Sequence, residues 1–218
     1  MAASFESHPV RRKKTPPRAW QRMLSGRRLN LLDPSPVDVE IEDIAHGLAR
    51  VGRWNGQTRG EHSYSVAQHS LLVEHIAGVI TPTAGSRTRL AILLHDAAEY
   101  VIGNMISPFK AVIGPAYRDT EARIIEAVMR RFGLPAPMPR LTATLAKKAD
   151  RAAAYHEATR LAGFSLDEAD EFFGPAFRID AATAALLEPW PTPVAEARFL
   201  DRFIALDRAA SQDDAKEK

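Results

Sequence analysis

An imidazole and a carboxylate stand side by side in one of the most apolar stretches of the chain, LAILLHDAAEYVIG at residues 90–103. The pair is His95-Asp96, and leucine, isoleucine and alanine surround it. Burying an ionised carboxylate is costly unless it is paired, hydrogen-bonded or bound to a metal. Glu99 follows His95 by four residues and Asp96 by three, so a helix would project it one turn further along the same side. The rest of the chain must show which of these three conditions applies.

Two more potential ligands lie elsewhere in the chain, each within a helical pattern. His69 occupies a core-facing position of the apolar stripe at residues 65–80. Asp150 lies in KKADRAAAYHEA, where small alanines at helical spacing leave room for a carboxylate to reach outward. The chain has no cysteine, so a metal would be held by histidine, aspartate and glutamate. Two imidazoles and two carboxylates from three helices suit a divalent cation such as Mn²⁺, Co²⁺, Fe²⁺, Ni²⁺ or Zn²⁺.

Each of these residues also has an ordinary structural interpretation. A single histidine on an apolar stripe is more often a satisfied core residue than a ligand, and this applies to His69. Asp150 stands among lysine and arginine residues, which is a common pattern on a solvated helix face. His95-Asp96 is the stronger signal, because no cationic partner for that carboxylate lies nearby in the sequence.

The elements that must position these side chains are predicted to be helices, because apolar residues recur at helical spacing between caps and breakers. The helices are expected at residues 40–51, 65–80, 88–100, 119–132, 141–163 and 193–206. The other segments are a hairpin-like extended entry at 28–41, a polar loop at 52–63 and turns at 103–115. We therefore expect an all-α fold, a single helical bundle at residues 21–210 around the buried helix at 88–100.

Composition limits the class of protein. The 218 residues are 45% hydrophobic and 26% charged, which is typical of a globular domain. No apolar run approaches the roughly 20 residues that a membrane helix needs, and the N-terminus lacks the apolar segment of a secretory signal. We therefore expect a cytoplasmic protein that has no membrane partner.

The net charge of +2 is unevenly distributed along the chain. Residues 1–32 hold eight basic residues against one acidic residue. Such an arm could hold nucleic acid, but Pro16-Pro17 and the lack of interleaved aromatic residues favour a solvated tail. We predict a basic, disordered tail at residues 1–20 and a polar tail at residues 211–218, and we do not expect nucleic-acid binding.

Three motifs, AQHS at 67–70, HDAAE at 95–99 and KKAD at 147–150, resemble the H…HD…D signature of the HD-domain metal-dependent phosphohydrolases. Within that superfamily the chain looks closest to the bacterial 5′-deoxynucleotidases and the phage deoxynucleoside-triphosphate hydrolases. The closeness depends on Arg53-Trp54 ahead of SVAQHS, on the acidic residue that closes HDAAE, and on the end of IGNMISPFK. The resemblance implies that the helical bundle at residues 21–210 is an HD domain.

The resemblance also implies a role for each matching residue. The metal ligands would be His69, His95, Asp96 and Asp150. Glu99 would be the carboxylate that activates or orients water. Arg53 and Lys110 would hold phosphate, and the ring of Trp54 would lie against the sugar or base. A metal would lower the pKa of water and polarise the phosphoryl oxygen, while the carboxylate accepts a proton.

Three further residues adjust this picture. Asn104 stands where these relatives usually carry an aspartate, and an amide cannot serve as a base or supply charge to a second metal. It stays a candidate for contact with the substrate. His62, in the loop before the second helix, could approach a phosphate or be an exposed loop histidine. Tyr100 follows Glu99, whereas HD domains that hydrolyse guanosine tetraphosphate carry an ED pair, which argues against that activity.

The resulting hypothesis is a metal-dependent phosphohydrolase that releases orthophosphate from (deoxy)nucleoside 5′-monophosphates. One alternative is a deoxynucleoside-triphosphate triphosphohydrolase. Another is a catalytically weak HD protein that binds nucleotides, which Asn104 would favour and an intact Glu99 would not. The expected partner is a small-molecule nucleotide, and a homodimer is suggested by the relatives.

Overall fold

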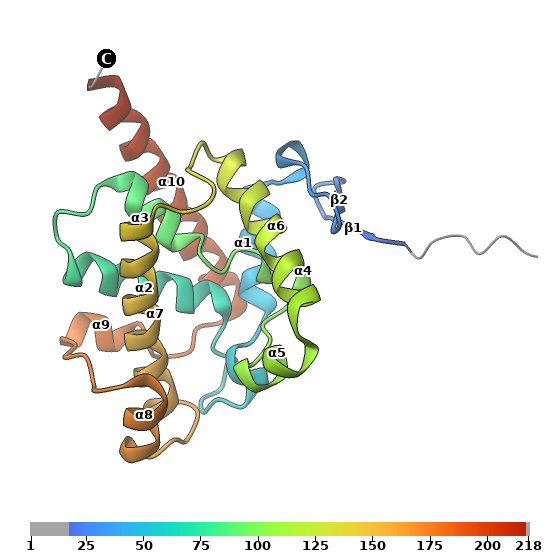
Figure 1. Cartoon of the computed structure of the whole chain (residues 1–218). Helices are drawn as coiled ribbons and strands as arrows, with labels where there is room; N and C mark the ends of the chain where they lie inside the picture. The colour runs from blue at the N-terminus through green and yellow to red at the C-terminus, as the bar shows by residue number, and fades with distance from the viewer. Residues whose placement is uncertain (1–17, 217–218) are drawn as a thin grey trace, which may run out of the picture.

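Helix α2 (Val66–Ile80) lies at the centre of the fold (Figure 1). The structure is a computed structural model, and it describes residues 18–216. Ser65 caps the helix by accepting a hydrogen bond from the amide of Gln68. The segment VAQHSLLVEHIAGVI is apolar on almost every side, and a helix of this kind is stable only when other elements cover it.

The helices that cover α2 come from both ends of the chain. They are α1 (Ile41–Arg50), α3 (Ser86–Leu93), α7 (Arg140–Arg160), α9 (Ala181–Ala185) and α10 (Thr192–Lys216). The all-α fold predicted from the sequence is confirmed, but its central helix is α2 and not the segment at residues 88–100. A side chain that points inward from α2 is therefore fixed by packing on several sides.

The segment predicted as one helix at residues 88–100 is broken at the histidine–aspartate pair. Helix α3 ends at Leu93, helix α4 (Glu99–Ile102) follows, and tight turns join them. In a continuous helix the amide of Asp96 would donate to the carbonyl of Ile92. Here Nδ1 of His95 lies 2.8 Å from that carbonyl oxygen, and the amide of His95 donates to the same oxygen. Because the carbonyl is already taken, the pair lies in a turn and not inside a helix.

An antiparallel hairpin precedes the helices. Strand β1 (Trp20–Arg22) pairs with strand β2 (Arg28–Asn30), so that Trp20 is opposite Asn30, and a short 3₁₀ helix, η1 (Pro36–Asp38), follows. Leu29 is fully buried and ties the hairpin to the core. The extended entry expected from the sequence is present, but it begins inside the predicted tail at residues 1–20. The rest of that tail, residues 1–17, lies outside the described part of the chain.

Several helices differ from the predicted boundaries. Helix α5 (Ser107–Ile113) occupies a segment predicted as turns, and helix α6 (Pro115–Arg131) begins earlier than expected. Helix α8 (Leu166–Phe173) was not predicted, although Ser165 and Glu168 form a capping box at its start. Helix α10 continues to Lys216, through most of the residues predicted as a polar tail.

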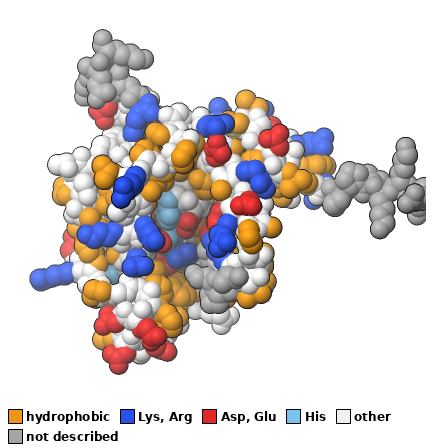
Figure 2. Space-filling view, in the orientation of Figure 1, with side chains coloured by type: hydrophobic (Ala, Val, Ile, Leu, Met, Phe, Trp, Pro, Cys, Tyr) orange, Lys and Arg blue, Asp and Glu red, His pale blue; other side chains and the backbone are white. Residues whose placement is uncertain are grey.

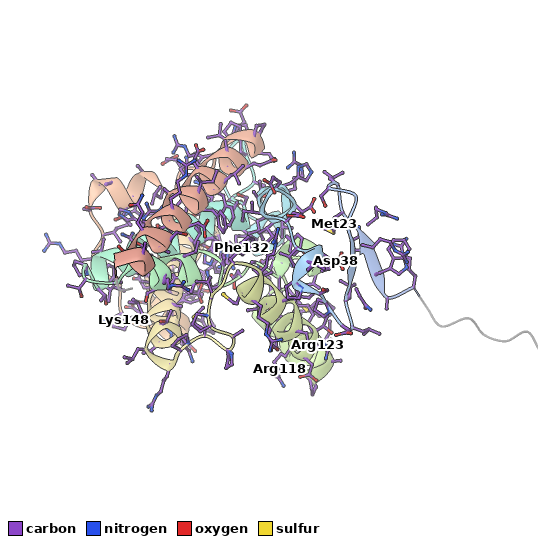
Figure 3. All side chains as sticks on the ribbon, turned by 90° about the horizontal axis from the view of Figure 1, so that it is seen from above. Met23, Asp38, Arg118, Arg123, Phe132 and Lys148 are labelled. Atoms are coloured by element: carbon purple, nitrogen blue, oxygen red, sulfur yellow. The ribbon has the colours of Figure 1, made fainter. Side chains whose placement is uncertain are left out.

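The core between α6 and α10 is closed by aromatic rings. Phe132, at the end of α6, points into the interior (Figure 3), and its ring packs edge-on against Phe203 of α10 with centroids 4.7 Å apart.

Within residues 18–216, none of the helices has both the length and the apolar character that crossing a membrane requires.

Candidate functional site

Two histidine side chains present unpaired nitrogen atoms to the same place. His69 is fully buried on α2, and its Nδ1 is hydrogen-bonded to the carboxylate of Glu157 on α7. His95, in the turn between α3 and α4, has Nδ1 bonded to the carbonyl of Ile92. The Nε2 atom of each ring is buried and makes no hydrogen bond. Fixing Nδ1 so that Nε2 is free is the arrangement that proteins use for metal-ligating imidazoles.

Two carboxylates complete the cluster. Oδ2 of Asp96 lies 3.5 Å from Nε2 of His69 and 3.4 Å from Nε2 of His95. Oδ1 of Asp150, on α7, lies 3.2 Å from Nε2 of His69. Ligand atoms of His69, His95 and Asp150 all lie within 4.8 Å of one another, so this group could hold a metal ion. The structure therefore brings the four predicted ligands together from α2, the turn and α7, and their nitrogen and oxygen atoms suit a divalent cation.

The charges of this cluster depend on one another. Burial alone would raise the pKa of Asp96, but the neighbouring imidazoles of His95 and His69 lower it below its ordinary value. Burial alone would lower the pKa of His69, but the carboxylates of Glu157 and Asp150 raise it well above its ordinary value. A proton on His69 and a cation beside its ring would satisfy the same carboxylates, so the cation would take the proton's place.

A cavity of about 600 Å³ opens beside the cluster. Asp96 and Asp150 line it, and Glu99 lies next to them on its wall. In Figure 2 a histidine side chain is visible at the bottom of a recess, with acidic and basic side chains around it. Two of the four predicted ligands, Asp96 and Asp150, therefore face a space that a small molecule can enter, and not a closed core.

Glu99 is the first residue of α4, and only 2% of its surface is exposed. Its two carboxylate oxygens accept hydrogen bonds from Nδ2 of Asn104 at 3.1 and 2.9 Å. Nζ of Lys110 lies 3.7 Å from Oε1 of Glu99 and 3.0 Å from Oε1 of Glu121. Burial and the charge of Asp96 raise the pKa of Glu99 to about 7, although Asn104 and other neighbours oppose the shift. Asn104, predicted to contact substrate, thus lines the cavity with its amide committed to Glu99.

Arg53 and Trp54 also line the cavity, and both donate to a carboxylate that the sequence analysis did not identify. They lie in the 3₁₀ segment η2 (Arg53–Gly56), where Trp54 has a left-handed φ of 55° that is rare for a bulky residue. Nε of Arg53 and Nε1 of Trp54 lie 3.2 and 2.9 Å from Oε2 of Glu157. Burial would lower the pKa of the Arg53 guanidinium, but Glu157 and Asp96 raise it. Glu157 therefore holds His69, a predicted metal ligand, and this loop at the same time.

Spacing along α7 contains the signal that would have identified Glu157. It follows Asp150 by seven residues, so the two carboxylates and Ala154 between them lie along one side of the helix. His62, by contrast, is not among the described residues that line the cavity. The structure thus places every predicted site residue except His62 in or beside the same cavity.

No model of a known protein family matches the chain. A protein of Rhodobacter capsulatus that is named only as uncharacterized is 53% identical to it over 194 residues. The match covers 89% of this chain and 98% of the Rhodobacter capsulatus protein, so nearly the whole of that protein corresponds to this chain.

Proposed function

We propose that this chain, which belongs to the same family as the Rhodobacter capsulatus protein, is a divalent-metal-dependent phosphohydrolase of the HD-domain type that releases orthophosphate from (deoxy)nucleoside 5′-monophosphates. One observation carries the proposal. Two imidazoles, each with Nδ1 fixed by a hydrogen bond and Nε2 buried without one, converge with two carboxylates at the wall of an open cavity. A buried polar atom without a partner is costly, and a bound cation would remove that cost at both rings.

The chain's own residues divide the remaining work. A divalent cation held by His69, His95 and the two aspartates would polarise a phosphoryl oxygen and lower the pKa of water. Glu99 is placed to accept a proton from the attacking water, because it lines the cavity beside Asp96 and Asn104 fixes both of its oxygens. The carboxylates of Asp96 and Asp150 would stay bound to the cation and would not take part in this proton transfer.

The cations of the cavity suit a phosphate group. Four cationic side chains and three carboxylates line it. The cationic side chains thus outnumber the carboxylates by one, and a bound divalent cation would make the lining more positive still. A phosphate monoester, which carries about two negative charges at neutral pH, suits such a lining. Arg53, whose Nε is held by Glu157, and Lys110, whose amine reaches Glu99, are the cations that other side chains fix in position. Such fixed cations offset the charge that develops on the phosphoryl oxygens.

A second candidate function, hydrolysis of deoxynucleoside triphosphates to tripolyphosphate, is favoured by two other cations. Lys147 and Arg151 of α7 line the same cavity, and neither forms an ion pair with any residue of the described chain. Unpaired cations at this place offer sites for further phosphates. A third hypothesis is a catalytically weak nucleotide-binding protein. The contact of Asn104 with Glu99 counts against it, because this contact fixes the carboxylate that would accept the proton.

The experiment that tests the proposal combines metal analysis with product identification. Protein loaded in turn with Mn²⁺, Co²⁺, Fe²⁺, Ni²⁺ or Zn²⁺ is incubated with dAMP and with dATP, and orthophosphate and tripolyphosphate are separated. We expect orthophosphate from dAMP. Asp96→Ala should lose both the bound metal and the activity, and Asp119→Ala, an exposed aspartate of α6, should keep both. Neither product above a metal-free blank would count against both enzymatic functions, and tight nucleotide binding without turnover would favour the third.

A further inference from the structure

The cavity has an aromatic wall that the chemistry around the metal ligands does not use. The wall consists of Phe164, Phe172 and Phe173, which are in ring contact with one another at centroid distances of 6.2 to 6.5 Å. Trp54 joins it, with its centroid 5.4 Å from that of Phe164 and 6.0 Å from that of Phe173. All four side chains line the cavity that also holds Asp96 and Glu99.

This wall is not part of the hydrophobic core. Helix α8 buries only Ala169, and Phe172 near its end is 62% exposed. Gly174, with a left-handed φ of 76°, ends the helix directly after the two phenylalanines and leaves them at the edge of the cavity. Exposed aromatic surface is unfavourable in water, and a group of such rings in one place marks a surface that a ligand or partner covers.

The wall lies at a defined place relative to the reacting groups. Glu157 links His69 to Trp54 by hydrogen bonds to both, so the aromatic rings begin one carboxylate away from a metal ligand. Along α7, Asp150 and the small residue Ala154 line the cavity one turn apart, and α7 packs against α8. The cavity is therefore charged at the metal ligands and aromatic next to α8.

We infer that Phe164, Phe172 and Phe173 form a stacking subsite for the nucleobase of the substrate. This inference rests on the proposed function, because the phosphate end must be at the metal ligands. A nucleotide has one highly charged end and one planar, aromatic end, which matches the two parts of this cavity. Among the described residues that line it, Asn104 has the only side-chain amide, and that amide is bonded to Glu99. The wall therefore presents the faces of its aromatic rings to the nucleobase. Stacking of a base on an aromatic side chain is a strong source of affinity.

The test compares two phosphate monoesters that differ only in the base, dAMP and 2-deoxyribose 5-phosphate, on metal-loaded protein. Phe172→Ala should raise the KM for dAMP about tenfold and leave the KM for 2-deoxyribose 5-phosphate unchanged. Phe172→Tyr, which keeps the ring, should restore the wild-type KM. Leu166→Ala is the matched control, since Leu166 is also on α8, is 65% exposed and does not line the cavity.

A binding measurement separates the failure of this inference from the failure of the proposed function. Calorimetric titration of the metal-loaded Glu99→Gln protein with the same two ligands should show a preference for dAMP that Phe172→Ala removes. If wild-type protein hydrolyses neither ester, the proposed function fails, but a base-dependent affinity lost in Phe172→Ala still supports the subsite. Equal affinities for the two ligands, or an equal loss for both in Phe172→Ala, would overturn it.

Discussion

His69 and Glu157 form a hydrogen bond in which neither side chain has any exposed surface. The bond joins α2 to α7, and the same carboxylate accepts from Arg53 and Trp54. A carboxylate behind a ligating histidine fixes the orientation of the ring and raises its basicity. Here the same group also orients the loop that lines the cavity, so the proposed metal ligands and the loop that would face the substrate share one support.

Replacing Glu157 by glutamine tests this shared support. His69 would keep an acceptor, but the new amide NH₂ group would face the donors of Arg53 and Trp54. We expect the affinity for the divalent cation to fall by about 10–100-fold. The free energy of unfolding should fall by about 1–3 kcal/mol, because two partly buried donors lose their acceptor. Calorimetric titration with Mn²⁺ and urea unfolding measure the two effects. Glu171→Gln, at an exposed position of α8, is the control, and an unchanged metal affinity in Glu157→Gln would refute the support.

Replacing Glu99 by glutamine should separate metal binding from turnover. The amide occupies the same volume but cannot accept a proton from water, so the release of orthophosphate should fall by at least about 100-fold. The metal content should stay at the wild-type value, because the four ligands are untouched. Glu126→Gln, at a half-buried position of α6 that does not line the cavity, should change neither quantity. Retained turnover in Glu99→Gln would remove this residue from its proposed role.

Asn104→Asp tests whether the amide at this position serves Glu99. In the structure the amide donates to both oxygens of Glu99, and an aspartate would place a second negative charge there. We expect turnover to fall by about tenfold at neutral pH, because like charges at this distance favour protonation of one of them. Asn55→Asp is a control on a neighbouring exposed amide. An increase in turnover would instead mean that an anionic group is needed here, as the resemblance to phosphohydrolases with an aspartate suggests.

The four potential ligands could be found from the sequence because their residue types conflict with their apolar or small neighbours. Glu157 could not be found in this way. Its partner His69 is 88 residues away along the chain, and the bond exists only because α2 packs against α7. The phenylalanines of α8 were missed for a related reason, since only the packing of α8 against α7 turns them toward the cavity.

The helix boundaries show a different limit. Apolar periodicity predicted one helix at residues 88–100, and the burial of Leu94 and Ala97 agrees with that pattern. The break arises from a local competition, in which the His95 ring takes the carbonyl of Ile92. A side chain that bonds its own backbone can end a helix without any glycine or proline, and periodicity does not register this event.

His156 makes the stability of the protein depend on pH. Its Nε2 donates to the carbonyl of Phe177 at 2.7 Å, and burial lowers the pKa of the imidazole below its ordinary value. A lowered folded-state pKa means that the unfolded chain takes up the proton first as the pH falls. The contribution of His156 is therefore complete above its unfolded pKa of about 6.5 and decreases below it.

Urea unfolding of wild-type protein and His156→Gln at about pH 8 and about pH 6 measures this contribution. Glutamine keeps a donor for Phe177 but does not titrate, so the stability of the wild type relative to the variant should decrease as the pH falls. His156→Leu removes the donor and should be less stable than the wild type by about 1 kcal/mol at the higher pH, with a smaller deficit at the lower pH. A difference between wild type and His156→Gln that is the same at both pH values would exclude the effect.

Gly47 of α1 allows α4 to approach closely enough to place Glu99. A Cβ atom on Gly47 would lie 2.8 Å from both Cβ and the carbonyl oxygen of Tyr100, the residue after Glu99. Alanine is favoured over glycine in a helix by roughly 1 kcal/mol, but overpacking against a backbone typically costs 1–3 kcal/mol. Gly47→Ala should therefore destabilise the protein by about 1 kcal/mol and should lower turnover more than metal affinity, because α4 must shift. In Gly78→Ala the new Cβ meets a side-chain end and no backbone, but the guanidinium of Arg89 is ion-paired with Glu74, so we expect a smaller loss of stability than in Gly47→Ala and unchanged turnover. Urea unfolding and the release of orthophosphate are measured for both variants. If Gly47→Ala keeps wild-type stability and turnover, the contact between α1 and α4 does not position Glu99.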